Sequence, residues 1–219
     1  MISGLFEIHV TVDISDLVAF RLYCWEYKYK MMLACSKYGD HPQQLMLSSW
    51  KNGTEVEAIK NAKTIAEDIK LKGIRVLRTK VEAMTSNKEV PEDTIRFKKG
   101  TVYGVDHFYT DPSQEYFEYH IKIEIDRPGE YEVLAKTIEP VGAHLSFNGL
   151  NREKVVPIIT LRVYNKGKNE ADEIKDKMFD LLRQAGFITH EQIQKEYSVY
   201  DDNPELDLNW LYKKKGLFW

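Results

Sequence analysis

The sequence predicts an α+β protein that contains two copies of one β-α-β-β-α-β unit, and three observations support this fold class. The stretch "LSSWKNGTEVEAIKNA" (47–62) matches "LRVYNKGKNEADEIKDK" (161–177), and in both an aromatic strand end precedes a Gly turn and a helix. Phe-Glu-x-His occurs at 6–9 and again at 117–120. Apolar residues then recur with strand and helix periods in the same order in both halves.

The first half begins with residues 6–12, where apolar and polar side chains alternate as in a half-buried strand. Thr54 and Glu57 form a capping box that starts the second helix, and Gly73 ends it. One face of this helix is expected to bury Val56, Ile59, Ala62, Ile65 and Ile69. The predicted elements are a strand at 6–12, a helix at 15–29, strands at 31–35 and 44–50, a helix at 54–73 and a strand at 75–83.

The second half repeats this order. Its predicted elements are a strand at 116–125, a helix at 130–139, strands at 143–147 and 155–164, a helix at 169–186 and a strand at 191–200. A split β-α-β arrangement of this kind is the ferredoxin-like pattern. We therefore predict an internal duplication of two ferredoxin-like halves, with mainly antiparallel sheets and a polar cleft between them.

Four segments follow from this division. Residues 1–83 form the first half, 84–115 a linker or a functional lid, 116–200 the second half, and 201–219 a C-terminal tail that packs on the body. The linker and the tail are both rich in aromatic residues, namely Tyr103, His107, Phe108 and Tyr109 in the linker, and Trp210, Phe218 and Trp219 with Leu217 in the tail.

Composition narrows the class of protein. The 219 residues carry a net charge of -3, which argues against general DNA binding and against a membrane-surface binder, since both need a basic excess. Two cysteines do not make a disulfide framework, and no leader or membrane-spanning stretch is evident. We expect a cytoplasmic protein.

The strands carry charge on one face. On the first strand Glu7, His9 and Thr11 alternate with apolar residues, and similar rows occur on the other strands, with Arg78, Lys80, Glu82, Glu118, His120, Lys122, Glu124, His144, Ser146, Thr160 and Arg162. These faces are either solvated, with charges paired across strands, or they approach each other and line a cleft or barrel. A cleft of this kind would hold water, a metal ion or an anionic ligand.

Two short motifs point to phosphate chemistry. "IHVTV" (8–12) and "AHLSF" (143–147) resemble the two His-x-Thr/Ser motifs of the 2H phosphoesterase superfamily, whose members are duplicated α+β proteins with a central cleft. The resemblance implies that His9 and His144 act as general base and acid, and that Thr11 and Ser146 donate hydrogen bonds to phosphate. Such a pair of histidines needs no cofactor.

Two alternatives include a metal ion. "EYHIKIE" (118–124) is similar to the charged strands of triphosphate tunnel enzymes, which hold metal with Glu and triphosphate with Lys and Arg, although their Glu-x-Glu-x-Lys motif is absent. Alternatively, the paired Glu-x-His strands offer four N and O ligands, which are Glu7, His9, Glu118 and His120.

The sequence thus favours a hydrolase that acts on a phosphoester or phosphoanhydride in a nucleotide, a cyclic phosphate or an RNA end. The catalytic candidates are His9, His120 and His144, and the phosphate-binding candidates are Thr11, Lys80, Lys122, Ser146 and Arg162. No cofactor is required, while a divalent metal is possible. The alternative is a non-catalytic module that binds an anionic ligand or a protein.

Overall fold

The computed structural model describes residues 1–37, 39–94, 115–125, 129–151, 156–187, 189–207 and 210, with the side chains of 189–192 left out. Its strands are Ser3–Val12 (β1), Lys30–Ser36 (β2), Gln43–Thr54 (β3), Val76–Met84 (β4), Tyr116–Ile123 (β5), His144–Asn148 (β6), Ile158–Tyr164 (β7) and Thr189–Asp201 (β8). Its α-helices are Leu17–Glu26 (α1), Glu55–Leu71 (α2), Glu130–Ile138 (α4) and Lys168–Gln184 (α5). Short 3-10 helices cover Ile14–Asp16 (η1), Glu139–Val141 (η3) and Pro204–Asp207 (η4).

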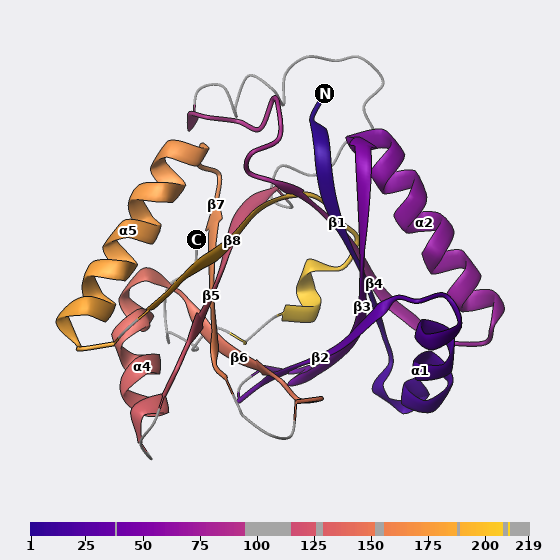
Figure 1. The fold of residues 1–219 in the computed structure, drawn as a ribbon, viewed down its shortest axis with the longest axis horizontal. Coiled ribbons are helices and arrows are strands. Elements are labelled where there is room, and N and C mark those ends of the chain that lie inside the picture. The colour runs from indigo at the N-terminus through magenta and orange to yellow at the C-terminus, as the bar shows by residue number, and fades with distance from the viewer. Residues whose placement is uncertain are drawn as a thin grey trace.

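The eight strands form one closed antiparallel sheet in the order β1-β3-β2-β6-β7-β5-β8-β4 (Figure 1). The α+β class is confirmed, but in place of two sheets with a cleft between them the strands form one barrel, which the sequence analysis gave as an alternative for the charged faces. The difference arises at two seams, where β2 pairs with β6 and β4 pairs with β8, so that the sheet of each half continues into the other. Within the halves, the strand orders are β4-β1-β3-β2 and β8-β5-β7-β6.

The helices lie outside the ring of strands, with α1 and α2 on one side and α4 and α5 on the other (Figure 1). Apolar side chains of the strands point outward and are buried beneath these helices, which stabilises the fold by roughly 1.5–3 kcal/mol for each large apolar side chain. The most buried of them on β1 and β5 are Phe6, Ile8, Val10, Phe117, Tyr119, Ile121 and Ile123. Because strand side chains alternate, the polar residues between them point inward.

Helix α2 begins as predicted. The Thr54 side chain accepts a hydrogen bond from the Glu57 backbone N–H, and the Glu57 side chain accepts one from the Thr54 backbone N–H. The predicted buried face of this helix is wrong at its first position, because Val56 is 56% exposed and Ala58 is buried instead. Ala58 lies four residues before buried Ala62, so it is the residue that shares the inner face of the first turn.

Among the described residues, no helix is long and apolar enough to cross a membrane. Two predicted features lie outside the described residues, namely the aromatic cluster of the linker (Tyr103, His107, Phe108 and Tyr109) and the end of the tail (Leu217, Phe218 and Trp219). In the described part of the tail, Leu206 and Trp210 are buried. The segment after β8 therefore packs on the body of the protein.

Candidate functional site

The interior of the closed sheet, called the lumen below, contains the charged faces of the strands. On β1, Glu7 lies opposite Glu82 of β4, and His9 lies opposite Lys80. In the other half, Glu118 of β5 lies between neighbours from two strands, Arg162 of β7 and Glu196 of β8. Since directly opposed residues in antiparallel strands share a face, this register gathers acids, bases and histidines inside one ring.

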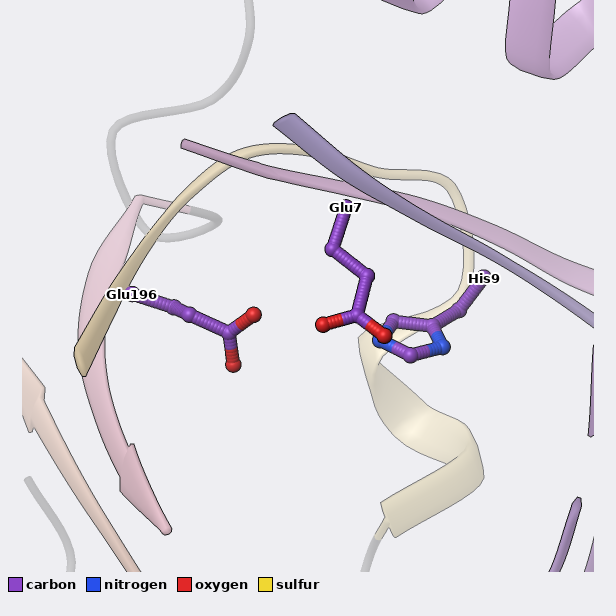
Figure 2. A group of neighbouring side chains, drawn as sticks. All are labelled: Glu7, His9 and Glu196. Atoms are coloured by element: carbon purple, nitrogen blue, oxygen red, sulfur yellow. The ribbon is translucent and has the colours of Figure 1, made fainter. Parts of the chain in front are cut away.

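Glu7, His9 and Glu196 form a compact group of potential metal ligands among the described residues. One oxygen or nitrogen atom from each of the three lies within 4.8 Å of the others. Figure 2 shows that Glu196 points from β8 across the lumen toward the other two side chains, which come from β1. Glu7 accepts hydrogen bonds from Ser48 Oγ and, at 2.5 Å, from Gln194 Nε2. These donors hold the Glu7 carboxylate in place.

Glu196 is a buried carboxylate whose nearby cation, Lys80, does not offset the effects of its burial and of its acidic neighbours. Its side chain is fully buried, and its Oε2 has no hydrogen-bond partner among the described residues. Burial raises the pKa of Glu196 well above its usual value, and the neighbouring carboxylates of Glu82 and Glu7 raise it further. This part of the lumen therefore has an excess of negative charge that a proton or a bound cation would relieve.

His9 and His120, two of the predicted catalytic residues, border the same set of carboxylates. His9 Nε2 lies 3.3 Å from Glu82 Oε2. His120 Nε2 lies 3.0 Å from Glu118 Oε1 and 3.5 Å from Glu196 Oε2, and its Nδ1 is 3.0 Å from Thr160 Oγ1. Glu196 is thus within reach of both histidines, one from each half.

Lys80 and Arg162, two of the predicted phosphate-binding residues, meet at Glu118. Its Oε2 lies 3.2 Å from Lys80 Nζ and 2.5 Å from Arg162 Nε, and Lys80 Nζ is also 2.7 Å from Glu82 Oε1. Burial alone would lower the pKa of Lys80, but the carboxylates of Glu118 and Glu82 raise it well above its usual value. Burial likewise opposes ionisation of Glu82, yet Lys80 and His9 hold its pKa at about 2. The ion pairs therefore remain charged at neutral pH.

Arg78, Asp201 and Asp207 form a second ionic group that the sequence analysis did not single out as a site. Arg78 donates from Nε to Asp201 Oδ1 at 2.8 Å and from Nη2 to Asp201 Oδ2 at 2.5 Å. Its Nη1 donates to Asp207 Oδ2 at 2.7 Å. The alternation of β4 already placed Arg78 on the charged face. Glu196 alternates with the apolar residues Tyr197 and Val199, which likewise places it on the charged face of its strand. No local pattern in the sequence indicates that Asp207 reaches the lumen.

His144, the third predicted catalytic histidine, is buried on β6 beside Trp210. The two rings meet edge to face with centroids 5.7 Å apart. Burial, together with the nearby Arg162 guanidinium, lowers the pKa of His144 to about 4. A neutral imidazole at pH 7 can accept a proton but cannot act as a general acid.

The remaining predicted phosphate-binding residues differ in exposure. Thr11 is buried on the inner face of β1, directly opposite Arg78. Ser146 is buried on β6 and lies opposite Ser36 of β2. Lys122 is exposed near the C-terminal end of β5, so it does not join the cations inside the sheet. The described geometry therefore groups Lys80 and Arg162 with Arg78 and leaves Lys122 apart.

Comparisons with known proteins give no relative for this chain. No family model matches it. No curated protein matches its sequence, and no solved structure matches its fold. Function therefore has to be argued from the site itself.

Proposed function

We propose that this protein is a cytoplasmic hydrolase that binds a phosphate-containing small molecule or an RNA end in the lumen and cleaves a phosphoester or phosphoanhydride bond. One observation carries the proposal. The buried cations Arg78 and Lys80 and the half-buried Arg162 lie inside the closed sheet together with a Glu-His group built around Glu196. Phosphoryl transfer needs both parts, since cations stabilise the phosphoryl oxygens and a carboxylate or histidine handles protons.

The excess of carboxylates favours a divalent metal ion as part of this mechanism. Glu7, His9 and Glu196 would supply two carboxylate oxygens and one imidazole nitrogen, a donor set that suits Mn²⁺ or Zn²⁺. A bound divalent ion would polarise a phosphoryl oxygen and lower the pKa of a bound water. It would also balance the negative charge that otherwise raises the pKa of Glu196. This ligand set replaces Glu118 and His120 of the predicted set with Glu196, because Glu118 already binds Lys80 and Arg162.

The metal-free alternative assigns proton transfer to histidines. His120 contacts Glu118 and Thr160 and is partly exposed, so it is the histidine best placed to exchange a proton with a ligand in the lumen. His144 can serve only as a base at neutral pH. The general-acid role that the 2H phosphoesterase motifs imply for His144 therefore lacks support from its surroundings, while the general-base role of His9 stays a prediction.

Hydrolysis of cyclic nucleotides, nucleoside triphosphates and tripolyphosphate, measured with Mg²⁺, Mn²⁺ or Zn²⁺ and again with EDTA, tests the proposal. We expect turnover that depends on the metal and that falls at least about 100-fold in Glu7→Gln, which removes one ligand charge. Glu67→Gln is the matched control, because Glu67 pairs with Lys70 on the surface. Absence of turnover by the wild-type protein on every substrate would refute the hydrolase and leave the non-catalytic anion-binding module. Turnover that persists in EDTA would instead favour the histidine mechanism.

We also propose that the two halves arose by internal duplication of a ferredoxin-like unit. Two features support this: both halves have the element order β-α-β-β-α-β, and their strand orders are β4-β1-β3-β2 and β8-β5-β7-β6. Superposition of β1–β4 on β5–β8 in a crystal structure provides the test. Equivalent strands that fail to superpose while α1 and α2 match α4 and α5 would contradict a common unit.

A further inference from the structure

The Asp207 carboxylate lies where cations from opposite walls of the lumen converge. Its Oδ2 is 2.7 Å from Arg78 Nη1 and 2.6 Å from Arg162 Nη1, and its Oδ1 accepts a hydrogen bond from Gln44 Nε2 at 2.7 Å. These donors belong to β4, β7 and β3, which are not neighbours in the sheet. One carboxylate thus gathers three donors from three separate strands.

Asp207 differs from the other lumen carboxylates because it is not part of the wall. It belongs to η4, the short helix that follows the last strand and lies inside the ring of strands (Figure 1). Residues 204–207 and 210 are called the lumen segment below. Leu206 is buried and its carbonyl accepts from Gln44 Nε2 at 3.2 Å, while Trp210 Nε1 donates to the His41 carbonyl at 3.0 Å. These two hydrogen bonds join the segment to Gln44 of β3 and to His41 just before it, and neither is part of the pairing between strands.

The two arginines are held by other residues, independently of Asp207. Asp201 binds Nε and Nη2 of Arg78, and Glu118 binds Nε of Arg162. Each guanidinium therefore keeps a fixed orientation and directs its Nη1 toward the position that Asp207 occupies. Fixed guanidinium groups that converge on one point match the oxygens of a carboxylate and of a phosphoryl group equally well.

We infer that Arg78, Arg162 and Gln44 form the subsite for a phosphoryl group, and that Asp207 occupies this subsite as an internal competitor. The lumen segment must then withdraw before a phosphate ligand can bind fully. The inference deepens the proposed function and rests on it for the class of ligand, a compact polyanion such as tripolyphosphate or the phosphate chain of a nucleotide. Because the competitor is tethered, it acts at a high effective concentration and weakens binding of a free anion.

Calorimetric titration of tripolyphosphate in the presence of EDTA tests this inference without requiring a metal or turnover. Asp207→Asn removes the competing charge and keeps the shape of the side chain, so we expect binding at least about tenfold tighter than in the wild-type protein. Glu205→Gln is the matched control, because it changes the same charge in the same short helix at an exposed position. It should bind tripolyphosphate as the wild-type protein does.

A second variant covers the case in which Asp207→Asn does not fold. Trp210→Ala removes the hydrogen bond to His41 and the ring contact with His144, and leaves all the lumen charges in place. It should also tighten binding of tripolyphosphate, and hydrogen exchange of residues 204–207 in the wild-type protein should rise when tripolyphosphate is added. Equal affinities of the variants and the wild-type protein, or no binding by any of them, would overturn the inference. Tighter binding by Asp207→Asn without turnover on any substrate would support the subsite and refute the hydrolase.

Discussion

Lys80 of the first half lies 3.2 Å from Glu118 of the second half, and their ion pair joins the two halves inside the lumen. Both side chains are buried, at 7% and 3% exposure. Lys80 is also the partner of Glu82, 2.7 Å away. One ammonium group thus compensates two buried carboxylates, which makes it more important to the fold than a surface ion pair.

Replacing Lys80 should therefore destabilise the protein strongly. Lys80→Met keeps most of the side-chain volume but leaves Glu82 and Glu118 without their shared cation, and breaking a buried pair in this way typically costs about 3–5 kcal/mol. Urea unfolding followed by circular dichroism measures the loss. Lys70→Met is the control, because Lys70 pairs with Glu67 on the surface and should contribute no more than about 1 kcal/mol. Similar losses in both variants would contradict the structural role of Lys80.

His144 should make stability fall as the pH decreases from about 6.5 toward 4. Its pKa in the folded protein is about 4, against 6.5 ordinarily, so within this window the unfolded chain binds a proton that the folded protein excludes. The groups that influence this proton are Arg162, Glu118, Asp207 and His120. Between pH 7 and 5 the expected loss is about 2 kcal/mol.

The comparison of wild type with His144→Gln isolates this contribution. The variant has no imidazole to protonate, so its free energy of unfolding should decrease less between pH 7 and 5 than that of the wild-type protein. Urea unfolding at both pH values provides the measurement. If the two proteins show the same pH dependence, the burial of His144 as a neutral group is wrong.

Glu196 should show a pH dependence of the opposite sign. Because its pKa is raised in the folded protein, its contribution to stability is present below about pH 4.5 and is lost as the pH rises toward the raised value. Glu196→Gln resembles the protonated acid and cannot ionise. The free energy of unfolding of this variant minus that of the wild-type protein should be larger at pH 8 than at pH 4.5. Urea unfolding in EDTA at both pH values measures this difference. Glu67→Gln, on the surface, should show no such difference.

Metal binding at this group should release a proton. A carboxylate ligand must be ionised to coordinate a metal, so binding of Mn²⁺ at a pH below the raised pKa of Glu196 would displace a proton from that side chain. Calorimetric titration of Mn²⁺ in two buffers of different ionisation enthalpy measures the proton count. Glu196→Gln should bind Mn²⁺ more weakly and release no proton. Binding without proton release by the wild-type protein would exclude Glu196 as a ligand.

Local patterns in the sequence were enough to predict the order of the elements and the charged face of the strands that carry Glu7, Lys80, Glu118, His144 and Arg162. The alternation around Glu7 and His9 fixes their face because side chains in a strand alternate with a period of two residues. The same argument places Lys80 and Glu118 inside. These positions follow from neighbours in the sequence, and the structure agrees with them.

Long-range features could not be obtained in this way. Closure of the sheet depends on pairs such as Cys35 with Phe147, whose partners belong to different halves and carry no local signal. The position of Asp207 depends on the path of the chain after β8, and its neighbours in the sequence resemble those of an exposed acidic turn. The sequence analysis therefore missed the ionic contacts of Arg78, and it also left out Glu196, although the alternation on β8 places that residue on the inner face.

Closure of the sheet also affects how this protein behaves at high concentration. In the part of the chain that the structure describes, each of the eight strands has a paired neighbour on both sides, so no strand has one whole side unpaired. Exposed edges are the usual templates for strand addition and aggregation. The seam between β2 and β6 joins only three residue pairs, against five between β4 and β8. If the ring opens between its two halves, the shorter seam is where unpaired strand edges would first be exposed, and substitutions there would promote aggregation.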